Sequence, residues 1–187
     1  MEPMAFTADE KEKMKLIAIH SIAHGLEFQE PLKVPTQDLP VMLQRHGAAF
    51  VTLTIRGKLR GCIGELEARR PLAESVAQNA YNAAFEDPRF PSLTDEEMEN
   101  LMIHISVLSH PEPMTFTSEE DLLSQIKPGV DGLILEAGYH KGTFLPSVWE
   151  NVEDKEEFWR ELKIKAGLPP DFWSDEVKVS RYHTEEF

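Results

Sequence analysis

Hydrophobic and polar residues alternate along two stretches of the chain, and this period of two predicts half-buried β-strands. The first stretch covers residues 49–56 and the second covers residues 101–108. Gly57 and Lys58 follow the first stretch and form a two-residue turn with glycine first, which is typical of a type II′ hairpin. We therefore expect a hairpin whose second strand runs from residue 59 to about residue 66.

The faces of these strands follow from the same alternation. In the second strand of the hairpin, Arg60, Cys62 and Gly64 share one face. A one-residue bulge would reverse this assignment. In the strand at 101–108, His104 and Ser106 lie opposite the apolar residues.

Capping residues and a helical period predict several helices between the strands. The expected helices cover residues 7–23, 71–85, 94–100 and 153–166, and another begins at Ser118. The first opens with a capping box at residues 7–10 and closes at Gly25. Its apolar side is expected to consist of Leu16, Ile17, Ile19 and Ile22.

Further strands complete the predicted fold. Residues 132–136 and 142–145 pair around a turn from Gly138 to Gly142, and residues 177–182 add a last strand. Strands joined by hairpins, with helices between groups of them, predict an α+β layered fold. We expect a largely antiparallel sheet with flanking helices, in a single domain over residues 1–187.

Composition and charge narrow the classes of function. The chain has 187 residues, 41% of them hydrophobic and 28% charged, as in a soluble globular protein. Its formal net charge of −14 repels phosphate backbones and anionic lipids, so we expect no nucleic-acid or membrane partner. Residues 1–6 lack a signal-peptide pattern. The single cysteine cannot form an intramolecular disulfide and fits a reducing cytosol, so we expect a cytoplasmic protein.

Cys62 is the first candidate for chemistry. A thiol near the Arg60 guanidinium would have a lowered pKa, which favours a nucleophilic or ligating thiolate. The alternative is a small buried residue of the sheet, the usual fate of a free cysteine. No sequence signature names a base for Cys62, so its catalytic role stays one of two open interpretations.

Arg60 and Arg56 are candidates for binding an anionic group, because a guanidinium matches a carboxylate in a two-pronged geometry. Arg89 is a further candidate binding residue. Arg60 neighbours the glycines of the hairpin, and Arg89 follows Asp87 in a loop. The alternative for Arg60 is an ion pair with one of the chain's 33 acidic residues. For Arg89, the alternatives are a brace with Asp87 around the hairpin, or a place in a helix stop that is followed by an anchoring aromatic residue.

Neither the glycines nor the histidines predict a cofactor or a metal. Gly57, Gly61 and Gly64 have neither the order of a dinucleotide-binding motif nor a helix directly after them. They fit a hairpin with close backbone packing, and Gly61 and Gly64 also leave room for a ligand. His20 and His24 lie one helical turn apart, but two ligands do not complete a metal site. We keep His104 and Ser106 as candidate binding residues of a polar groove.

The chain resembles the AMMECR-type domain family over nearly its whole length. The hallmark is the hexapeptide Leu59-Arg60-Gly61-Cys62-Ile63-Gly64. Further similar segments are residues 47–53, 87–91, 106–109, 111–113, 132–136, 144–150 and 158–168.

This resemblance implies a fold and a context. It implies two α+β subdomains with the hexapeptide near a cleft between them, although it does not place their boundary. Related domains occur beside Memo-like and radical-SAM proteins, which implies an accessory or binding role in a modification pathway with such partners. One departure is His104, where an acidic residue is expected in many relatives.

Two functional hypotheses follow from the sequence. In the one we favour, the protein is a binding or accessory module that docks a partner. In the alternative it is an enzyme that acts on a small anionic or carbonyl substrate. Arg60 would then orient the substrate, Cys62 would attack it, and backbone amides from Gly61 to Gly64 would stabilise negative charge.

Overall fold

A computed structural model describes residues 5–187 and divides them into two compact units. Unit 1 extends to Ser109 and takes in Glu185–Phe187, whereas unit 2 consists of His110–Thr184. The chain thus leaves unit 1 once and returns to it for three residues. Residues 1–4 lie outside the described residues. They belong to residues 1–6, in which the sequence shows no signal-peptide pattern. That the units form one tightly packed domain stays a prediction.

Unit 1 is built on an antiparallel sheet. Its strands are β1 (His46–Ile55), β2 (Lys58–Gly64), β3 (Arg70–Pro71), β4 (Leu101–Leu108) and β9 (Thr184–Glu186). The order across the sheet is β2-β1-β4-β9, and β3 pairs with the start of β1. β1 runs antiparallel to both β2 and β4, so it is the central strand.

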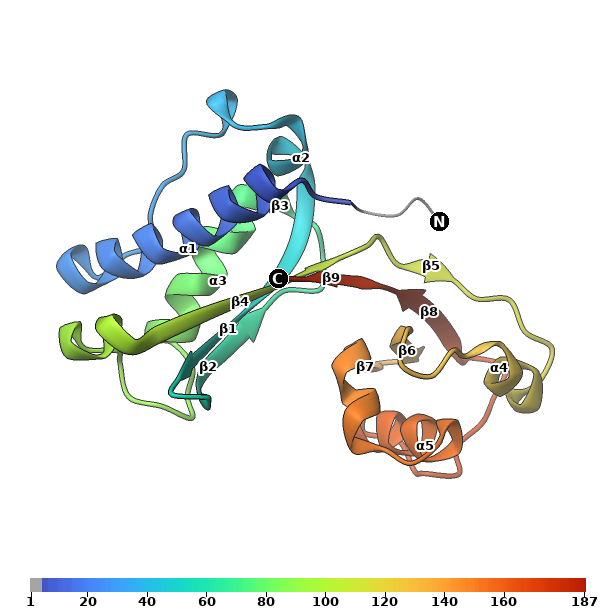
Figure 1. Cartoon of the computed structure of the whole chain (residues 1–187). Coiled ribbons are helices and arrows are strands. Elements are labelled where there is room, and N and C mark those ends of the chain that lie inside the picture. The colour runs from blue at the N-terminus through green and yellow to red at the C-terminus, as the bar shows by residue number, and fades with distance from the viewer. Residues whose placement is uncertain (1–4) are drawn as a thin grey trace. The chain divides into compact units, whose positions relative to one another are not determined.

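Helices cover one face of this sheet (Figure 1). The helical elements of unit 1 are α1 (Ala8–Phe28), η1 (Thr36–Asp38), α2 (Val41–Gln44), α3 (Leu72–Phe85) and η2 (Asp95–Asn100). The core joins α1 and α3 to the inward residues of β1 and β4, such as Val51, Leu53 and Ile105. The capping box at Thr7 and Glu10 is present as expected.

α1 departs from the expected pattern in its end and in its buried side. It passes Gly25 and ends at Phe28, with Gln29 in the left-handed conformation at φ 58°. Gly25 is buried within the helix. Glycine is needed there because a Cβ would lie 2.4 Å from the Phe85 ring. Leu16 and Ile19, expected on the packed side, are 47% and 40% exposed. The buried residues of α1 are Met14, Ile17, Ala18, Ser21, Ile22 and Gly25. Several of them are small, so α3 can pack close to this side of the helix, and the larger Leu16 and Ile19 lie on the exposed side.

The β1–β2 hairpin differs from the prediction in its turn and its register. Arg56 and Gly57 form the turn with φ of 52° and 78°, and Ile55 pairs with Lys58. Two positive φ angles are typical of a type I′ turn, so the turn lies one residue earlier than the expected type II′ turn at Gly57–Lys58. Leu53 pairs with Gly61 but Thr54 pairs with Leu59, so Arg60 is the extra residue of a bulge.

Unit 2 contains a second antiparallel sheet with helices against one face. The strands are β5 (Glu112–Pro113), β6 (Gly132–Ala137), β7 (His140–Phe144) and β8 (Lys178–Tyr182), in the order β5-β8-β6-β7. The helical elements are α4 (Glu119–Gln125), η3 (Pro146–Asn151) and α5 (Lys155–Lys165). Leu133, Leu135 and Val179 pack with Phe158 and Trp159 in a separate core. The β6–β7 turn is at Gly138–Tyr139, so β7 begins two residues before the strand expected at 142.

The expected α+β class with antiparallel sheets and flanking helices is confirmed by both units. None of the helices in residues 5–187 combines the length and the hydropathy that a bilayer span requires. The hydrophobic residues are instead divided between the two cores.

Candidate functional site

The candidate site lies on the face of the unit 1 sheet that α1 and α3 do not cover, which we call the outer face. The register aligns its side chains in three rows across neighbouring strands. These rows are Leu59–Thr54–Met102, Cys62–Thr52–His104 and Gly64–Phe50–Ser106. Because side chains alternate along each strand, all three rows point away from the helices.

Cys62 is held in place mainly through its backbone. Its N–H donates to Asp87 Oδ2 at 3.0 Å, and its C=O accepts from Arg89 Nη2 at 3.4 Å. The half-buried thiol lies 3.2 Å from Thr52 Oγ1. His104 lies beyond Thr52 in the same row, so its Cα is about 10 Å from that of Cys62. The neighbour of the sulfur is therefore a hydroxyl group and not a base.

Asp87 and Arg89 form a brace, which was one of the alternatives predicted from the sequence. Arg89 donates from Nε to Oδ1 at 3.0 Å and from Nη2 to Oδ2 at 2.7 Å, and the Asp87 carboxyl is buried. These hydrogen bonds from Arg89 hold the pKa of Asp87 well below its ordinary value, although burial opposes the shift. The same pairing raises the pKa of Arg89. The guanidinium thus joins the loop after α3 to the edge of β2.

Arg60 points into the protein and is only 8% exposed. Its Nε donates to Glu97 Oε2 and its Nη2 donates to the Pro91 carbonyl, both at 2.8 Å. Its guanidinium also lies 5.7 Å from the Phe90 ring centre. Because the bulge interrupts the alternation between Arg60 and Cys62, the two side chains do not share the outer face as strict alternation predicts.

Gly61 and Gly64 serve close packing within unit 1. A Cβ at Gly61 would lie 2.0 Å from the carbonyl oxygen of Ala83 in α3. A Cβ at Gly64 would lie 2.2 Å from the Phe50 ring. Gly61 lets the helix approach β2, and Gly64 leaves space for an aromatic ring on the outer face.

His104 and Ser106 meet a carboxylate that sequence analysis missed. His104 Nε2 lies 3.7 Å from Glu186 Oε2, and Ser106 Oγ donates to Glu186 Oε1 at 3.3 Å. Glu186 belongs to β9, whose three residues are too few to show an alternating pattern. Its position could be found only from the pairing of β9 with β4.

The structure therefore separates the seven predicted site residues into two groups. Four of them, Cys62, Gly64, His104 and Ser106, lie on the outer face. The other three, Arg60, Gly61 and Arg89, connect β2 to α3 and to the loop that follows it. Among residues 5–187, no three side chains of the metal-ligating types come together as a metal site. His24 instead lies 3.6 Å from Glu30.

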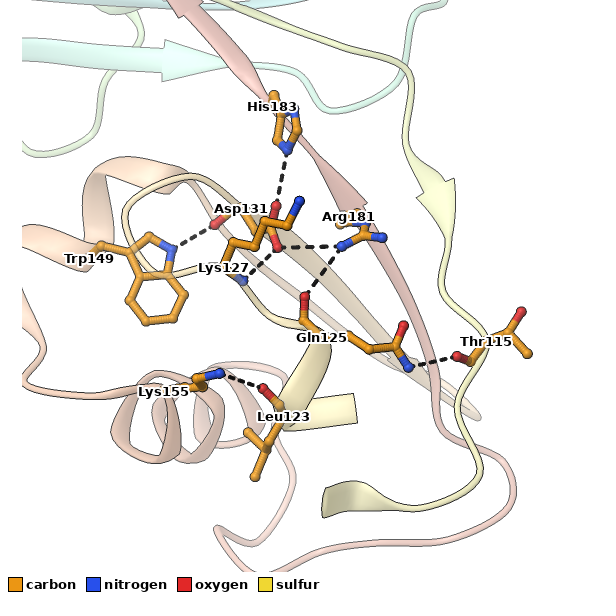
Figure 2. A network of polar contacts seen from close by, with 9 residues as sticks. All are labelled: Thr115, Leu123, Gln125, Lys127, Asp131, Trp149, Lys155, Arg181 and His183. Atoms are coloured by element: carbon orange, nitrogen blue, oxygen red, sulfur yellow. Dashed lines mark hydrogen bonds and ion pairs between the residues drawn. The ribbon is translucent and has the colours of Figure 1, made fainter. Parts of the chain in front are cut away.

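Unit 2 contains a polar network that sequence analysis did not identify (Figure 2). The fully buried Asp131 carboxylate accepts from the Lys127 backbone at 2.9 Å and lies 3.0 Å from His183 Nε2 and 3.8 Å from Arg181 Nη1. Its backbone carbonyl accepts from Trp149 Nε1 at 2.7 Å. These contacts tie the turn before β6 to β8 and η3, which is a structural role.

Comparisons with known proteins match most or all of the chain. The sequence model of the AMMECR1 family matches residues 16–187. A protein of Methanothermobacter thermautotrophicus is 40% identical over 100% of this chain and 98% of its own length. One from Methanocaldococcus jannaschii is 41% identical over 83% of this chain and 79% of its own length. The crystal structure of an uncharacterized protein from Pyrococcus horikoshii has a TM-score of 0.85 at 36% identity, covering 97% of this chain and 92% of that one.

Proposed function

Because the chain belongs to the AMMECR1 family, we propose that it is a binding or accessory module that docks a partner protein on the outer face of the unit 1 sheet. The observation that carries this proposal is that Arg60 and Arg89 are both bound to groups within the protein. Arg60 is bound to Glu97 and Pro91, and Arg89 is bound to Asp87 and the Cys62 carbonyl. A small anionic substrate would therefore meet guanidinium groups that are already held by these partners, although Arg60 Nη1 is buried without a partner among residues 5–187.

The composition of the outer face suits contact with another protein. Met102 and Leu59 are 66% and 45% exposed in one row, although both are apolar. The next row is polar, with Thr52 between Cys62 and His104. Exposed apolar side chains beside polar groups are typical of protein interfaces.

The partner class that we propose comes from the family resemblance. A Memo-like or a radical-SAM protein would bring the chemistry, and this chain would support it within a modification pathway in the cytoplasm. Its acidic surface, with a net charge of −14, favours a partner with a basic docking surface.

Calorimetry tests this proposal. It measures the affinity of this protein for purified Memo-like and radical-SAM proteins from the same genome. Met102→Asp places a charge on the outer face and should weaken binding at least tenfold. Val41→Asp is the matched control, because Val41 is 63% exposed in α2, away from the outer face, and should leave the affinity unchanged. Cys62→Ser should also bind normally. Binding to neither protein, or equal effects of Met102→Asp and Val41→Asp, would contradict the proposal.

One observation favours an enzyme as the second candidate. The thiol of Cys62, the imidazole of His104 and the carboxylate of Glu186 lie on one face of the sheet, with Thr52 between the first two. A water molecule or the Thr52 hydroxyl could relay a proton between thiol and imidazole. Cys62 would then attack a small carbonyl substrate.

The rate of Cys62 alkylation as a function of pH separates the two candidates. The docking proposal predicts an unactivated thiol that reacts slowly with iodoacetamide at neutral pH. His104→Gln should leave this profile unchanged. A fast reaction at neutral pH that His104→Gln slows would instead support the enzyme.

A further inference from the structure

The helical side of unit 1 carries an open groove. Residues 30–34, which follow α1, line one wall, and Arg70, Glu74 and Gln78 line the other. The volume of the groove is about 340 Å³, within the range of about 300–1,000 Å³ that is usual for small-molecule sites. Because α3 covers the face of the sheet opposite the outer face, this groove is separate from the proposed docking surface.

Hydrogen bonds hold the first wall of the groove against α3. Ser21 Oγ accepts from the Leu32 N–H at 3.1 Å and donates to the Ala77 carbonyl at 2.7 Å. Ser21 is completely buried, so this link is shielded from water. Prolines at positions 31 and 35 further restrict the backbone of the wall. The shape of the groove is therefore set by the protein itself.

Three polar side chains follow one another along the second wall at intervals of four residues. They belong to Arg70, directly before α3, and to Glu74 and Gln78 within it. Arg70 Nε lies 3.4 Å from Glu65 Oε1, but its guanidinium donates no hydrogen bond to another residue of 5–187. Glu74 is half-buried, and its carboxylate has no partner in that range. The Gln78 amide nitrogen donates to Asn82 Oδ1 at 3.0 Å, which leaves its carbonyl oxygen to accept.

The groove thus presents positive charge at one end and acceptors at the other. The Arg70 guanidinium matches a carboxylate. The Glu74 carboxylate and the Gln78 carbonyl, one helical turn apart, suit an ammonium group. Lys33 is exposed on the facing wall, and nothing in the described part of the chain pairs with its side chain, so it adds a second positive charge.

The facing wall is otherwise largely apolar. Pro31, Leu32 and Val34 are half-buried and line the groove. They can cover an aliphatic side chain. The net charge of −14 repels small anions, but it does not repel a zwitterion, which has no net charge.

We propose that this groove binds a free α-amino acid with an aliphatic side chain. Its carboxylate would lie at Arg70, its ammonium group between Glu74 and Gln78, and its side chain against the apolar wall. Side chains four residues apart on a helix are about 5–6 Å from each other, so one amino acid can reach both charges. This site goes beyond the docking function and does not depend on it.

Binding of leucine and three analogues to the full chain, measured by titration calorimetry, tests the assignment. Leucine should bind at millimolar concentration. Leucinamide lacks the carboxylate and N-acetylleucine lacks the ammonium group, so each should bind at least tenfold more weakly. Glycine keeps both charges but lacks the side chain, and it should also bind at least tenfold more weakly.

Variants assign each charge of the ligand to one residue. Glu74→Gln should weaken leucine binding at least tenfold and remove the preference for leucine over N-acetylleucine. Arg70→Gln should remove the preference for leucine over leucinamide. Glu99→Gln is the matched control, because Glu99 is exposed in η2 and does not line the groove, and it should leave the affinity unchanged.

Three results would overturn the inference. The first is no binding of leucine to the unmodified chain at millimolar concentration, and the second is equal binding of leucine and both blocked analogues. The third is an equal effect of Glu74→Gln and Glu99→Gln in variants whose circular dichroism shows an intact fold. If Glu74→Gln does not fold, the comparison of analogues on the unmodified chain decides alone.

Discussion

Gly61 is the residue of the hairpin that tolerates a side chain least. The atoms nearest to an added Cβ are the carbonyl oxygen and carbon of Ala83, at 2.0 and 2.9 Å. Both belong to the backbone of α3 and cannot rotate away. Gly57, in the turn, has open space around it although its φ is 78°. Glycine is therefore required at 61 by helix packing and at 57 only by backbone conformation.

Gly61→Ala should lower the free energy of unfolding by about 2 kcal/mol or more, because β2 and α3 must move apart. Gly57→Ala is the matched control, and its cost should be about 1 kcal/mol from the positive φ. Urea unfolding followed by circular dichroism measures both values. A smaller loss for Gly61→Ala than for Gly57→Ala would contradict the close packing of β2 against α3.

Asp87→Asn should destabilise the protein by about 2 kcal/mol near neutral pH, because the buried charge pair with Arg89 is lost. The pKa of Asp87 in the folded state lies below its ordinary value of 3.8. Its ionised form therefore stabilises the fold above that pH, and this contribution is lost as the pH falls below it. The difference in unfolding free energy between the two proteins should accordingly shrink steadily as the pH falls below 3.8. A difference that stays constant with pH would show that the charge of Asp87 is not what stabilises the loop.

Sequence patterns located the hexapeptide but did not give the direction of its arginine. Alternation placed Cys62, Gly64, His104 and Ser106 on the face where they lie. The direction of Arg60 depends on a bulge, and the bulge depends on which two residues form the turn. Arg56 adopts a positive φ there, which is uncommon for a residue with a side chain and gives no signal in the sequence.

At the scale of the element, α1 shows how an apolar pattern can mislead. Its start and capping box could be predicted, but its end and part of its buried side could not. Ala18, Ser21 and Gly25 are buried because α3 packs close to them, and hydrophobicity alone does not mark such positions. β9 was missed for a different reason, since three residues carry no period and their pairing with β4 is a long-range contact.

Two isoleucines of α1 provide a matched test of this packing. Ile22 is 0% exposed and Ile19 is 40% exposed. Ile22→Ala should cost about 2–4 kcal/mol of stability, because it leaves a cavity in the core. Ile19→Ala should change stability by no more than about 0.5 kcal/mol. Equal losses measured by urea unfolding would mean that the helix is rotated relative to this description.

At the scale of the whole molecule, unit 1 depends on residues that come after unit 2 in the chain. Phe187 pairs with Ile105 and packs against the unit 1 core. Glu185 accepts from the Phe6 N–H and lies 2.9 Å from Lys11 Nζ. The composition of either half of the sequence gives no sign of this connection.

Removal of residues 185–187 should lower the stability of unit 1 by roughly 2 kcal/mol, from the lost aromatic burial and backbone pairing. The Ile105 amide should then exchange faster, because its acceptor is the Phe187 carbonyl. Glu186→Gln is the control, since it keeps the strand and should leave this exchange unchanged. An Ile105 amide that stays protected after the deletion would contradict a stabilising role of β9.

The return of the chain to unit 1 also imposes an order of events during synthesis. β1, β2 and β4 are all made before residue 110, so their sheet can form early. β4 then lacks its neighbouring strand β9 until unit 2 has been translated, which takes several seconds at about 5–20 residues per second. Over that time the strand is exposed at Ile105. A nascent chain is thus open to strand exchange with other polypeptides in this interval, and the pairing of β9 with β4 ends it at Ile105.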